Sequence, residues 1–261
     1  MKAPTATGPR IVLWDIETTH NLAAVFRLLN MDMIPAENII QERYIVCAAW
    51  KVLGEAKVHS VSVLDDPKRF KKQPADDTFV CQTLHDVLSA ADVIVAHNGD
   101  AYDIKFTETR MLRNQLDPLP PIPKIDTLKI AKDRFLFNAN SLDYLGTFLG
   151  VGRKKPTTNG LWLRVLQSDK AAIEEMEAYN RQDVLLLERV FNKLRPYAAS
   201  HINQSLYTGK SGCPRCGSTR IQARGTHKSL TQVYQRFQCQ DCGGWYRQRK
   251  ANKSSTSTRV L

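Results

Sequence analysis

The chain has 261 residues, with 37 Lys and Arg against 26 Asp and Glu, so its formal net charge is +11. A hydrophobic content of 43% allows a folded core, while 13 Gly and 12 Pro are too few for a collagen-like or low-complexity chain. No apolar run approaches the roughly 20 residues of a membrane-spanning helix, so we expect no association with a membrane.

The early part of the chain predicts three strands, and the part that follows predicts alternating helices and strands. This order is typical of a mixed α/β sheet covered by helices. In chain order, the expected elements are strands at 10–18, 44–53 and 57–64, a polar loop at 65–78, a helix at 83–90, a strand at 92–96 and a helix at 102–114. Next come a short strand ending at Ile125 and helices at 127–135, 141–149 and 170–194, the last of which can break near Tyr179.

The excess positive charge lies at the C-terminal end. From Thr208 to Leu261 there are eleven basic residues and one acid, Asp241, which leaves 26 basic and 25 acidic residues in the first 207. A near-neutral body with a basic end indicates a polyanionic partner, usually a nucleic acid. We expect an N-terminal arm at 1–10, a main domain at 11–195, a linker at 196–212, a cysteine module at 213–250 and a disordered tail at 251–261.

Two acids at the end of the first expected strand are candidate metal ligands. Asp15 and Glu17 are two residues apart, so a strand directs both side chains to one face. Asp103 follows a buried strand, and Asp183 lies one turn after Tyr179 on the longest helix. Buried carboxylates repel one another, and a divalent cation relieves the repulsion. Four of them suit two Mg²⁺ or Mn²⁺ ions, an arrangement that cleaves phosphodiesters.

Three motifs resemble those of the DEDD (DnaQ-like) 3′–5′ exonuclease superfamily. They are Trp-Asp-Ile-Glu-Thr-Thr at 14–19, Asn-Gly-Asp-Ala-Tyr-Asp at 98–103 and Tyr-Asn-Arg-Gln-Asp at 179–183. The last has the Tyr-x-x-x-Asp form of the DEDDy subgroup. The resemblance covers residues 10–194 and implies a ribonuclease H-like fold with a central mixed sheet. It also implies a stand-alone nuclease, because the chain leaves no room for polymerase palm and fingers.

The resemblance implies a role for each motif residue. Asp15, Glu17, Asp103 and Asp183 would hold the two metal ions, and all four would be catalytic. Tyr179 would orient the attacking water, because a phenol with a pKa of about 10 positions a water more readily than it deprotonates one.

Other polar residues near these motifs have weaker assignments. Asn98 is a candidate contact to the substrate backbone, with turn capping as an equally good interpretation. Asp126 is expected to cap a helix rather than to bind metal. The basic loop with Arg153, Lys154 and Lys155 is expected to be solvated, with guidance of the substrate strand as the alternative.

Four cysteines near the C-terminus form two Cys-x-x-Cys pairs. The pairs are Cys213 with Cys216 and Cys239 with Cys242, separated by 22 residues. This spacing predicts one structural Zn²⁺ held by four thiolates, with strands at 220–224 and 232–238 forming a hairpin between the pairs. A unit of this size cannot build a sufficient core, so the metal supplies its folding energy. The module resembles the zinc ribbons of transposases and transcription proteins.

Cations and aromatic side chains are interleaved in the cysteine module. This combination binds single-stranded nucleic acids, because cations contact phosphates and aromatic faces stack on bases. Docking of the module on the nuclease is the alternative. The candidate nucleic-acid contacts in the module are Arg215, Arg224, Lys228, Arg236, Trp245 and Arg247.

The leading hypothesis is a metal-dependent 3′–5′ exonuclease that acts on single-stranded DNA or DNA 3′ ends, with replication or repair proteins as partners. The alternatives are an RNA 3′–5′ exonuclease, a structure-specific DNA endonuclease and a non-enzymatic zinc-ribbon adaptor. The absence of a secretory signal and the zinc-like cysteine pattern predict a reducing, cytoplasmic location, in bacteria or in a phage-infected host.

Overall fold

The computed structural model describes residues 8–25, 33–198, 202–208 and 211–254. Contacts divide the chain into two units. The first, called here the nuclease unit, consists of Arg10–Lys129 and Phe137–Val190. The second, called the ribbon unit, consists of Ile130–Leu136, Phe191–Leu261 and Met1–Pro9 as far as these are described.

A five-stranded mixed sheet forms the centre of the nuclease unit. Its strand order is β5-β4-β1-β6-β7, with β4 antiparallel to β1 and β5, and with β6 parallel to β1 and β7. Strand β4 is almost entirely apolar and buried, and so is the first half of β1, as expected for strands covered on both faces. The strands span Ile11–Thr18 (β1), Ile45–Val52 (β4), His59–Ser62 (β5), Val93–Ala96 (β6) and Lys124–Asp126 (β7).

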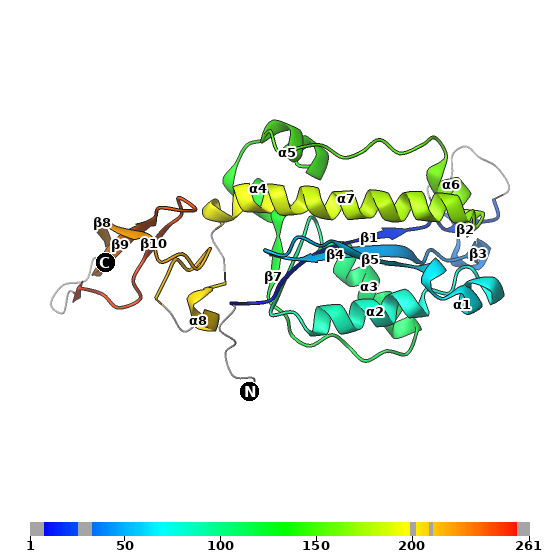
Figure 1. Cartoon of the computed structure of the whole chain (residues 1–261), viewed down its shortest axis with the longest axis horizontal. Helices are drawn as coiled ribbons and strands as arrows, with labels where there is room; N and C mark the ends of the chain where they lie inside the picture. Colours follow the sequence, from blue (N-terminus) through cyan, green and yellow to red (C-terminus); the bar gives the residue numbers. More distant parts are fainter. Residues whose placement is uncertain (1–7, 26–32, 199–201, 209–210, 255–261) are drawn as a thin grey trace. The chain divides into compact units, whose positions relative to one another are not determined.

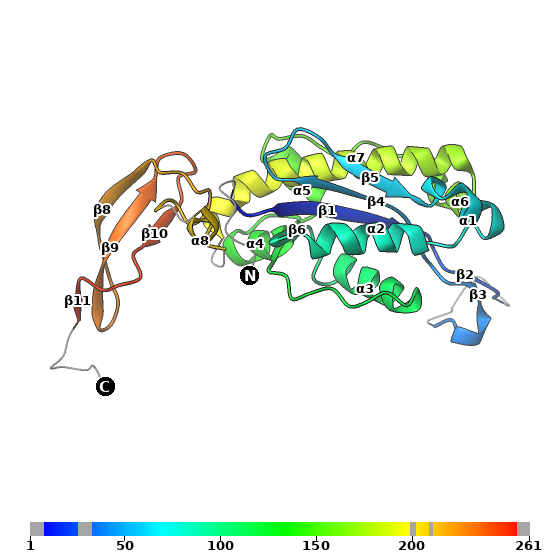
Figure 2. The same ribbon diagram turned by 60° about the horizontal axis from the view of Figure 1, so that its bottom comes forward.

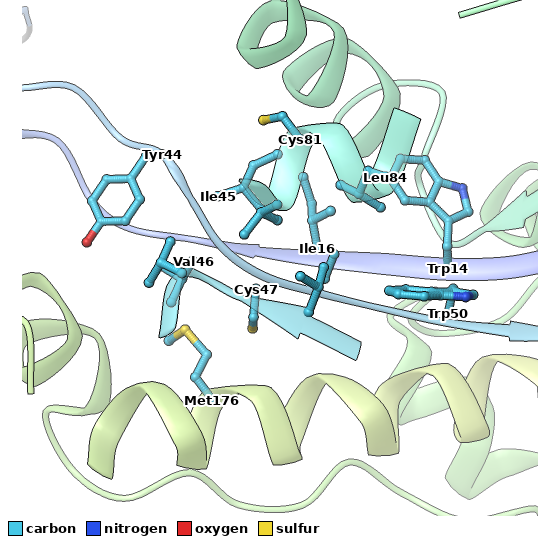
Figure 3. Packing of buried hydrophobic residues seen from close by; sticks show 14 of the residues in the cluster. Trp14, Ile16, Tyr44, Ile45, Val46, Cys47, Trp50, Cys81, Leu84 and Met176 are labelled. Atoms are coloured by element: carbon cyan, nitrogen blue, oxygen red, sulfur yellow. The ribbon is translucent and has the colours of Figure 1, made fainter. Parts of the chain in front are cut away.

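Helices cover both faces of this sheet (Figure 1). Helix α7 runs along one face, while α2 and α3 lie against the other. Figure 3 shows Cys81 and Leu84 of α2 on one side of the strands and Met176 of α7 on the other. The helices span Pro67–Lys72 (α1), Thr78–Ser89 (α2), Asp103–Arg113 (α3), Thr127–Arg134 (α4), Leu142–Phe148 (α5), Leu161–Leu166 (α6) and Lys170–Leu194 (α7).

The expected fold class, a mixed α/β sheet flanked by helices, is confirmed, and three details differ. The segment expected to be a loop contains α1, because Pro67 begins that helix and Asp66 caps it by accepting the Arg69 N–H. Helix α7 is unbroken at Tyr179. Helix α6 and a small hairpin of β2 (Leu22–Ala23) with β3 (Ile39–Gln41) were not expected, since these segments are short and weakly periodic.

The ribbon unit contains a four-stranded antiparallel sheet (Figure 2). Strand β9 pairs with β8, β10 and β11. The hairpin is longer than expected, since its first strand, expected to end at residue 224, continues as β8 to Lys228. The elements here are α8 (Ser205–Thr208), β8 (Ile221–Lys228), β9 (Gln232–Cys239), β10 (Trp245–Arg247) and β11 (Lys253–Ser254). Strand β11 lies in the part expected to be a disordered tail, of which residues 255–261 lie outside the described residues.

None of the helices among the described residues combines the length and the apolar character needed to cross a membrane.

Candidate functional site: an acidic cluster and a four-cysteine cluster

Strand β1 and helix α7 bring three carboxylates together. Asp15 and Glu17 occupy alternate positions near the end of β1, and Asp183 is buried on α7. One ligand oxygen from each of the three lies within 4.8 Å of the other two. The amide nitrogen of Asn180, also fully buried on α7, donates to Asp15 Oδ2 at 2.7 Å and so ties the helix to the strand.

Asp103 stands beside this group but outside its closest set. It is buried at the first turn of α3, and its carboxylate accepts a hydrogen bond from the backbone N–H of Ile16. Its negative charge acts on Asp15, whose pKa it helps to raise. The structure therefore places Asp15, Glu17 and Asp183 in one cluster and Asp103 at its edge.

Burial raises the pKa values of all four acids, and the charge of at least one neighbouring carboxylate adds to each shift. Burial, followed by the charges of its neighbours, raises the pKa of Asp15 well above its usual range. Burial raises the pKa of Glu17 to about 7, although the Lys154 ammonium opposes the shift. Burial also raises the pKa of Asp103 to about 6 and that of Asp183 above its ordinary value. Such crowding of anions marks a site that stabilises bound cations.

Lys154 lies among these acids. Its Nζ donates to Asp183 Oδ2 at 2.6 Å and to the Tyr179 hydroxyl at 3.1 Å, and its own N–H donates to Asp143 Oδ1 at 2.7 Å. Burial disfavours its charge, but Asp183 outweighs this and raises the pKa of Lys154 above its ordinary value. The expectation of a solvated Lys154 is therefore wrong, whereas Lys155 is exposed.

The Tyr179 hydroxyl faces the same cluster. Burial, and then the negative charge of Asp183, raise the pKa of Tyr179 to about 12, so the phenol keeps its proton at neutral pH. A neutral hydroxyl both donates and accepts hydrogen bonds, which suits it to orient a water molecule.

The donor atoms of the acidic cluster fit a hard divalent cation. All are carboxylate oxygens, which Mg²⁺ and Mn²⁺ prefer. Asp183 Oδ1 is buried and accepts no hydrogen bond from any described residue, so one ligand oxygen remains available. Asp15, Glu17 and Asp183 would hold such an ion, with Asp103 adding negative charge.

Asn98 occupies a tight turn. Its backbone is in the left-handed region, with a φ of 67°, and its N–H donates to Asp126 Oδ1 at 2.9 Å. The same oxygen accepts the N–H of Leu128 at 2.9 Å, so Asp126 holds this turn and the start of α4. These contacts agree with the turn interpretation of Asn98 and the capping interpretation of Asp126.

Asn180 was not singled out from the sequence, and Lys154 was expected in a basic loop rather than in the acidic cluster. Asn180 lies three residues before Asp183, so both share a face of α7, and this periodicity is the signal that was available. No local pattern indicates that Lys154 enters the cluster. That placement depends on the contact between its backbone and Asp143.

The four C-terminal cysteines form a second cluster with a geometry suited to zinc. Their sulfur atoms lie within 4.8 Å of one another, at 3.7 Å between Cys213 and Cys242 and at 3.6 Å between Cys216 and Cys239. A tetrahedral site with Zn–S bonds of about 2.3 Å has sulfurs about 3.8 Å apart. A disulfide would place two sulfurs about 2.05 Å apart. The cluster therefore fits one Zn²⁺.

The backbone around the sulfurs supports this fit. The residue after each second cysteine, Gly217 or Gly243, has a φ above 70°, which a side chain would disfavour. Burial disfavours the thiolate of Cys239, but the N–H groups of Cys242 and Asp241 outweigh it and lower the pKa of Cys239 to about 7. Backbone N–H groups thus stabilise the metal-binding thiolate form of Cys239, whereas burial raises the pKa of Cys213 and of Cys216 above the ordinary value.

The basic residues of the ribbon unit have different surroundings. The guanidinium of Arg215 donates to the carbonyls of Pro196 and Ala198, so it is engaged with the chain itself. Arg236 lies over the ring of Trp245, 4.8 Å from its centroid, and donates to the Arg224 carbonyl. Arg247 lies 3.7 Å from the ring centroid of Tyr234. Lys228 ends β8 and is exposed.

Comparison with known proteins supplies independent information. No curated protein matches the chain. Among solved structures, the chain is similar to the family B DNA polymerase from the hyperthermophilic archaeon Pyrobaculum calidifontis, with a TM-score of 0.53 and 14% sequence identity. The likeness covers 85% of this chain and 31% of that polymerase, and at this identity it concerns the fold alone. The family model of the RNase_H superfamily matches residues 53–195, more than half of the chain, which therefore belongs to the RNase_H superfamily.

Proposed function

We propose that this protein is a metal-dependent 3′–5′ exonuclease that hydrolyses phosphodiester bonds of single-stranded DNA or DNA 3′ ends. The convergence of Asp15, Glu17 and Asp183 within 4.8 Å carries the proposal. Membership of the RNase_H superfamily supports nuclease activity in general. The 3′–5′ direction and the strand preference come from the resemblance of the three motifs to DEDDy exonucleases.

Divalent cations, when bound, supply charge stabilisation and a more acidic water. The acids of the cluster would hold them, and Asn180 fixes the orientation of Asp15. Tyr179 keeps its proton and positions the water through its hydroxyl. Lys154 stays protonated, so its ammonium offers positive charge to a phosphate oxygen rather than accepting a proton.

The proposal also covers the domain organisation, the C-terminal zinc ribbon and the partners. We assign residues 11–195 to an exonuclease domain, 196–212 to a linker and 213–250 to a zinc ribbon that binds the nucleic acid. A cytoplasmic location and replication or repair proteins as partners belong to the same proposal. The complete set of acids, and their raised pKa values, argue against a non-enzymatic adaptor.

End-labelled substrates test the proposal. Single- and double-stranded DNA and RNA, labelled at either end, are incubated with Mg²⁺ or Mn²⁺, and the products are separated by length. We expect mononucleotide release from the 3′ end of single-stranded DNA. Preference for RNA or internal cleavage would instead support the RNA exonuclease or the endonuclease.

Substitution of the acids tests the site itself. Asp15→Asn and Asp183→Asn each remove a ligand charge, and we expect each to lower the rate by about 10²-fold or more with an unchanged circular dichroism spectrum. Asp86→Asn is the matched control, because Asp86 is an exposed acid on α2. Undiminished cleavage by both cluster variants would refute the assignment.

A further inference from the structure

The ribbon unit contains a basic groove that the sequence motifs do not indicate. Its volume is about 760 Å³, and all of its lining residues belong to the ribbon unit. One side comes from the zinc knuckles and β10, and the other from the ends of α4 and α7 and the turn after α7. Its lining includes Arg134, Lys193, Arg195, Tyr197, Asp241 and Trp245.

Arg134 and Lys193 of this groove are available to a ligand, whereas Arg215, which also lines it, donates to backbone carbonyls. Arg134 and Lys193 are exposed, and neither side chain makes an ion pair or hydrogen bond with another residue of the described ranges. The Nε of Arg195 is buried and has no hydrogen-bond acceptor among those residues, while its guanidinium lies 5.9 Å from the ring centroid of Phe191. Asp241, the acid of the groove, is paired with Arg220 at 2.7 Å, so its charge is compensated. Cys216 and Cys242 also line the groove, and their cluster stays net negative with one Zn²⁺ bound. The free positive charge therefore lies on the opposite side of the groove, at Arg134 of α4 and Lys193 of α7.

Two aromatic rings accompany these cations. Trp245 is 44% exposed and Tyr197 is 57% exposed, which is high for rings of this size. Each has support from within the unit, since Arg236 lies over the indole and Phe135 meets the phenol ring edge-on at 5.2 Å. Supported rings lose little conformational freedom when a flat group stacks on them.

We infer that this groove binds a single strand of nucleic acid, with bases stacked on Trp245 and Tyr197 and phosphates at Arg134, Lys193 and Arg195. Cations with exposed aromatic faces form the combination that holds unpaired strands, whereas the bases of a duplex are already stacked on one another. The proposed nucleic-acid site thus extends beyond the zinc ribbon at residues 213–250 and includes Arg134, Lys193, Arg195 and Tyr197. This inference rests on the proposed function in that a nucleic acid is the substrate.

Binding is measured without cleavage. The full chain, loaded with zinc and carrying Asp15→Asn, is titrated into fluorescein-labelled oligothymidylate or oligouridylate, and fluorescence anisotropy is followed at several salt concentrations. We expect Trp245→Ala and Tyr197→Ala each to raise Kd by roughly 5- to 100-fold, the range for one lost stacking contact. Trp245→Phe keeps an aromatic face and should retain most of the affinity, which separates stacking from misfolding.

Charge reversal tests the phosphate contacts with a matched control. Arg134→Glu and Lys193→Glu should weaken binding and lower the salt slope by about 0.7 or more each. Lys132→Glu makes the same change at an exposed position of α4 that does not line the groove, and it should leave Kd within about twofold. Equal effects of Lys132→Glu and Arg134→Glu, or an unchanged Kd in all groove variants, would overturn the inference.

Comparison of oligothymidylate with oligouridylate tests the sugar preference, and a separate activity assay distinguishes this inference from the proposed function. Binding of either strand through the groove supports the inference and identifies the sugar, while binding of neither refutes it. Cleavage by the unsubstituted chain is assayed in parallel. Groove-dependent binding without cleavage would refute the proposed function alone, and cleavage with groove-independent binding would refute this inference alone.

Discussion

At the scale of single residues, Lys154 and Asn180 organise the acidic cluster. Asn180 uses its amide nitrogen to hold Asp15, and Lys154 contributes one positive charge beside Asp183 and Tyr179. Burial is the main reason why the pKa values of Asp15, Glu17, Asp103 and Asp183 are raised, and the single ammonium of Lys154 opposes the shift without cancelling it. The remaining repulsion favours binding of a divalent cation.

Replacement of Lys154 tests its part in the reaction. Lys154→Ala removes the cation nearest to Asp183, and we expect kcat to fall by about 10²-fold on single-stranded DNA with Mg²⁺. Lys155→Ala removes the same charge from an exposed position of the same loop and should change kcat by less than about twofold. Equal losses in the two variants would show that only the charge of the loop matters.

The raised pKa of Glu17 predicts a pH-dependent stability. Glu17 has an ordinary pKa of 4.5 and a pKa of about 7 in the folded protein. Between these values the unfolded chain loses this proton while the folded chain keeps it, so stability falls as pH rises. Glu17→Gln cannot ionise. In thermal unfolding without Mg²⁺ or Mn²⁺, we expect it to raise Tm by a few degrees at pH 8 and to have a smaller effect at pH 4.

Addition of Mg²⁺ should raise the Tm of the unsubstituted protein at pH 8 and have less effect on Glu17→Gln, because the variant has lost one ligand charge. If the Tm values of the unsubstituted protein and of Glu17→Gln changed with pH in the same way, the result would contradict this account of Glu17.

At the scale of secondary structure, α7 and the cysteine knuckles position the two clusters. Helix α7 packs Ile173 and Met176 against the sheet and presents Asn180 and Asp183 to β1, so its continuity places apolar and polar residues on one buried face. In the ribbon unit, the segment before the first knuckle supports it, since Gln204 donates to the Arg215 carbonyl at 2.8 Å.

Loss of one thiolate should destabilise the ribbon without unfolding the nuclease unit. Cys213→Ser removes one of four sulfurs, and because the small unit depends on metal for stability, we expect zinc content to fall well below one per chain. Limited proteolysis should then cut within residues 211–254. Cys47→Ala is the control, because Cys47 is buried in β4, away from the cluster. Full zinc content in Cys213→Ser would contradict the assignment.

At the scale of the whole molecule, the charge is unevenly distributed along the chain. The part before Thr208 is nearly neutral, yet it contains a cluster of acids that requires cations. The positive excess lies from Thr208 onward, and the groove also contains Arg134 and Lys193, which come before that part of the chain. Such a division suits an enzyme in which one part cuts the strand and another holds it.

Much of the fold follows from the sequence, because its signals are local. Each of these signals depends on residues that are close together in the sequence. They are the apolar run of β1, the repeat of apolar positions along α7 and the two Cys-x-x-Cys pairs. The segment of α1 was missed because six residues with Lys, Arg and one Phe carry little periodicity. The break expected at Tyr179 does not occur, since packing against the sheet stabilises the helix on both sides of it.

The sequence by itself determined the family resemblance, the acids of the motifs and the four cysteines, because residue type and spacing along the chain carry these features. Tertiary structure alone decided that Asp103 stands at the edge of the cluster, that Lys154 enters it and that Arg215 binds backbone carbonyls. It also decided that Arg134, Tyr197 and Trp245 line one groove. These residues are far apart in the chain, and only the packing of helices, strands and knuckles sets the distances between them.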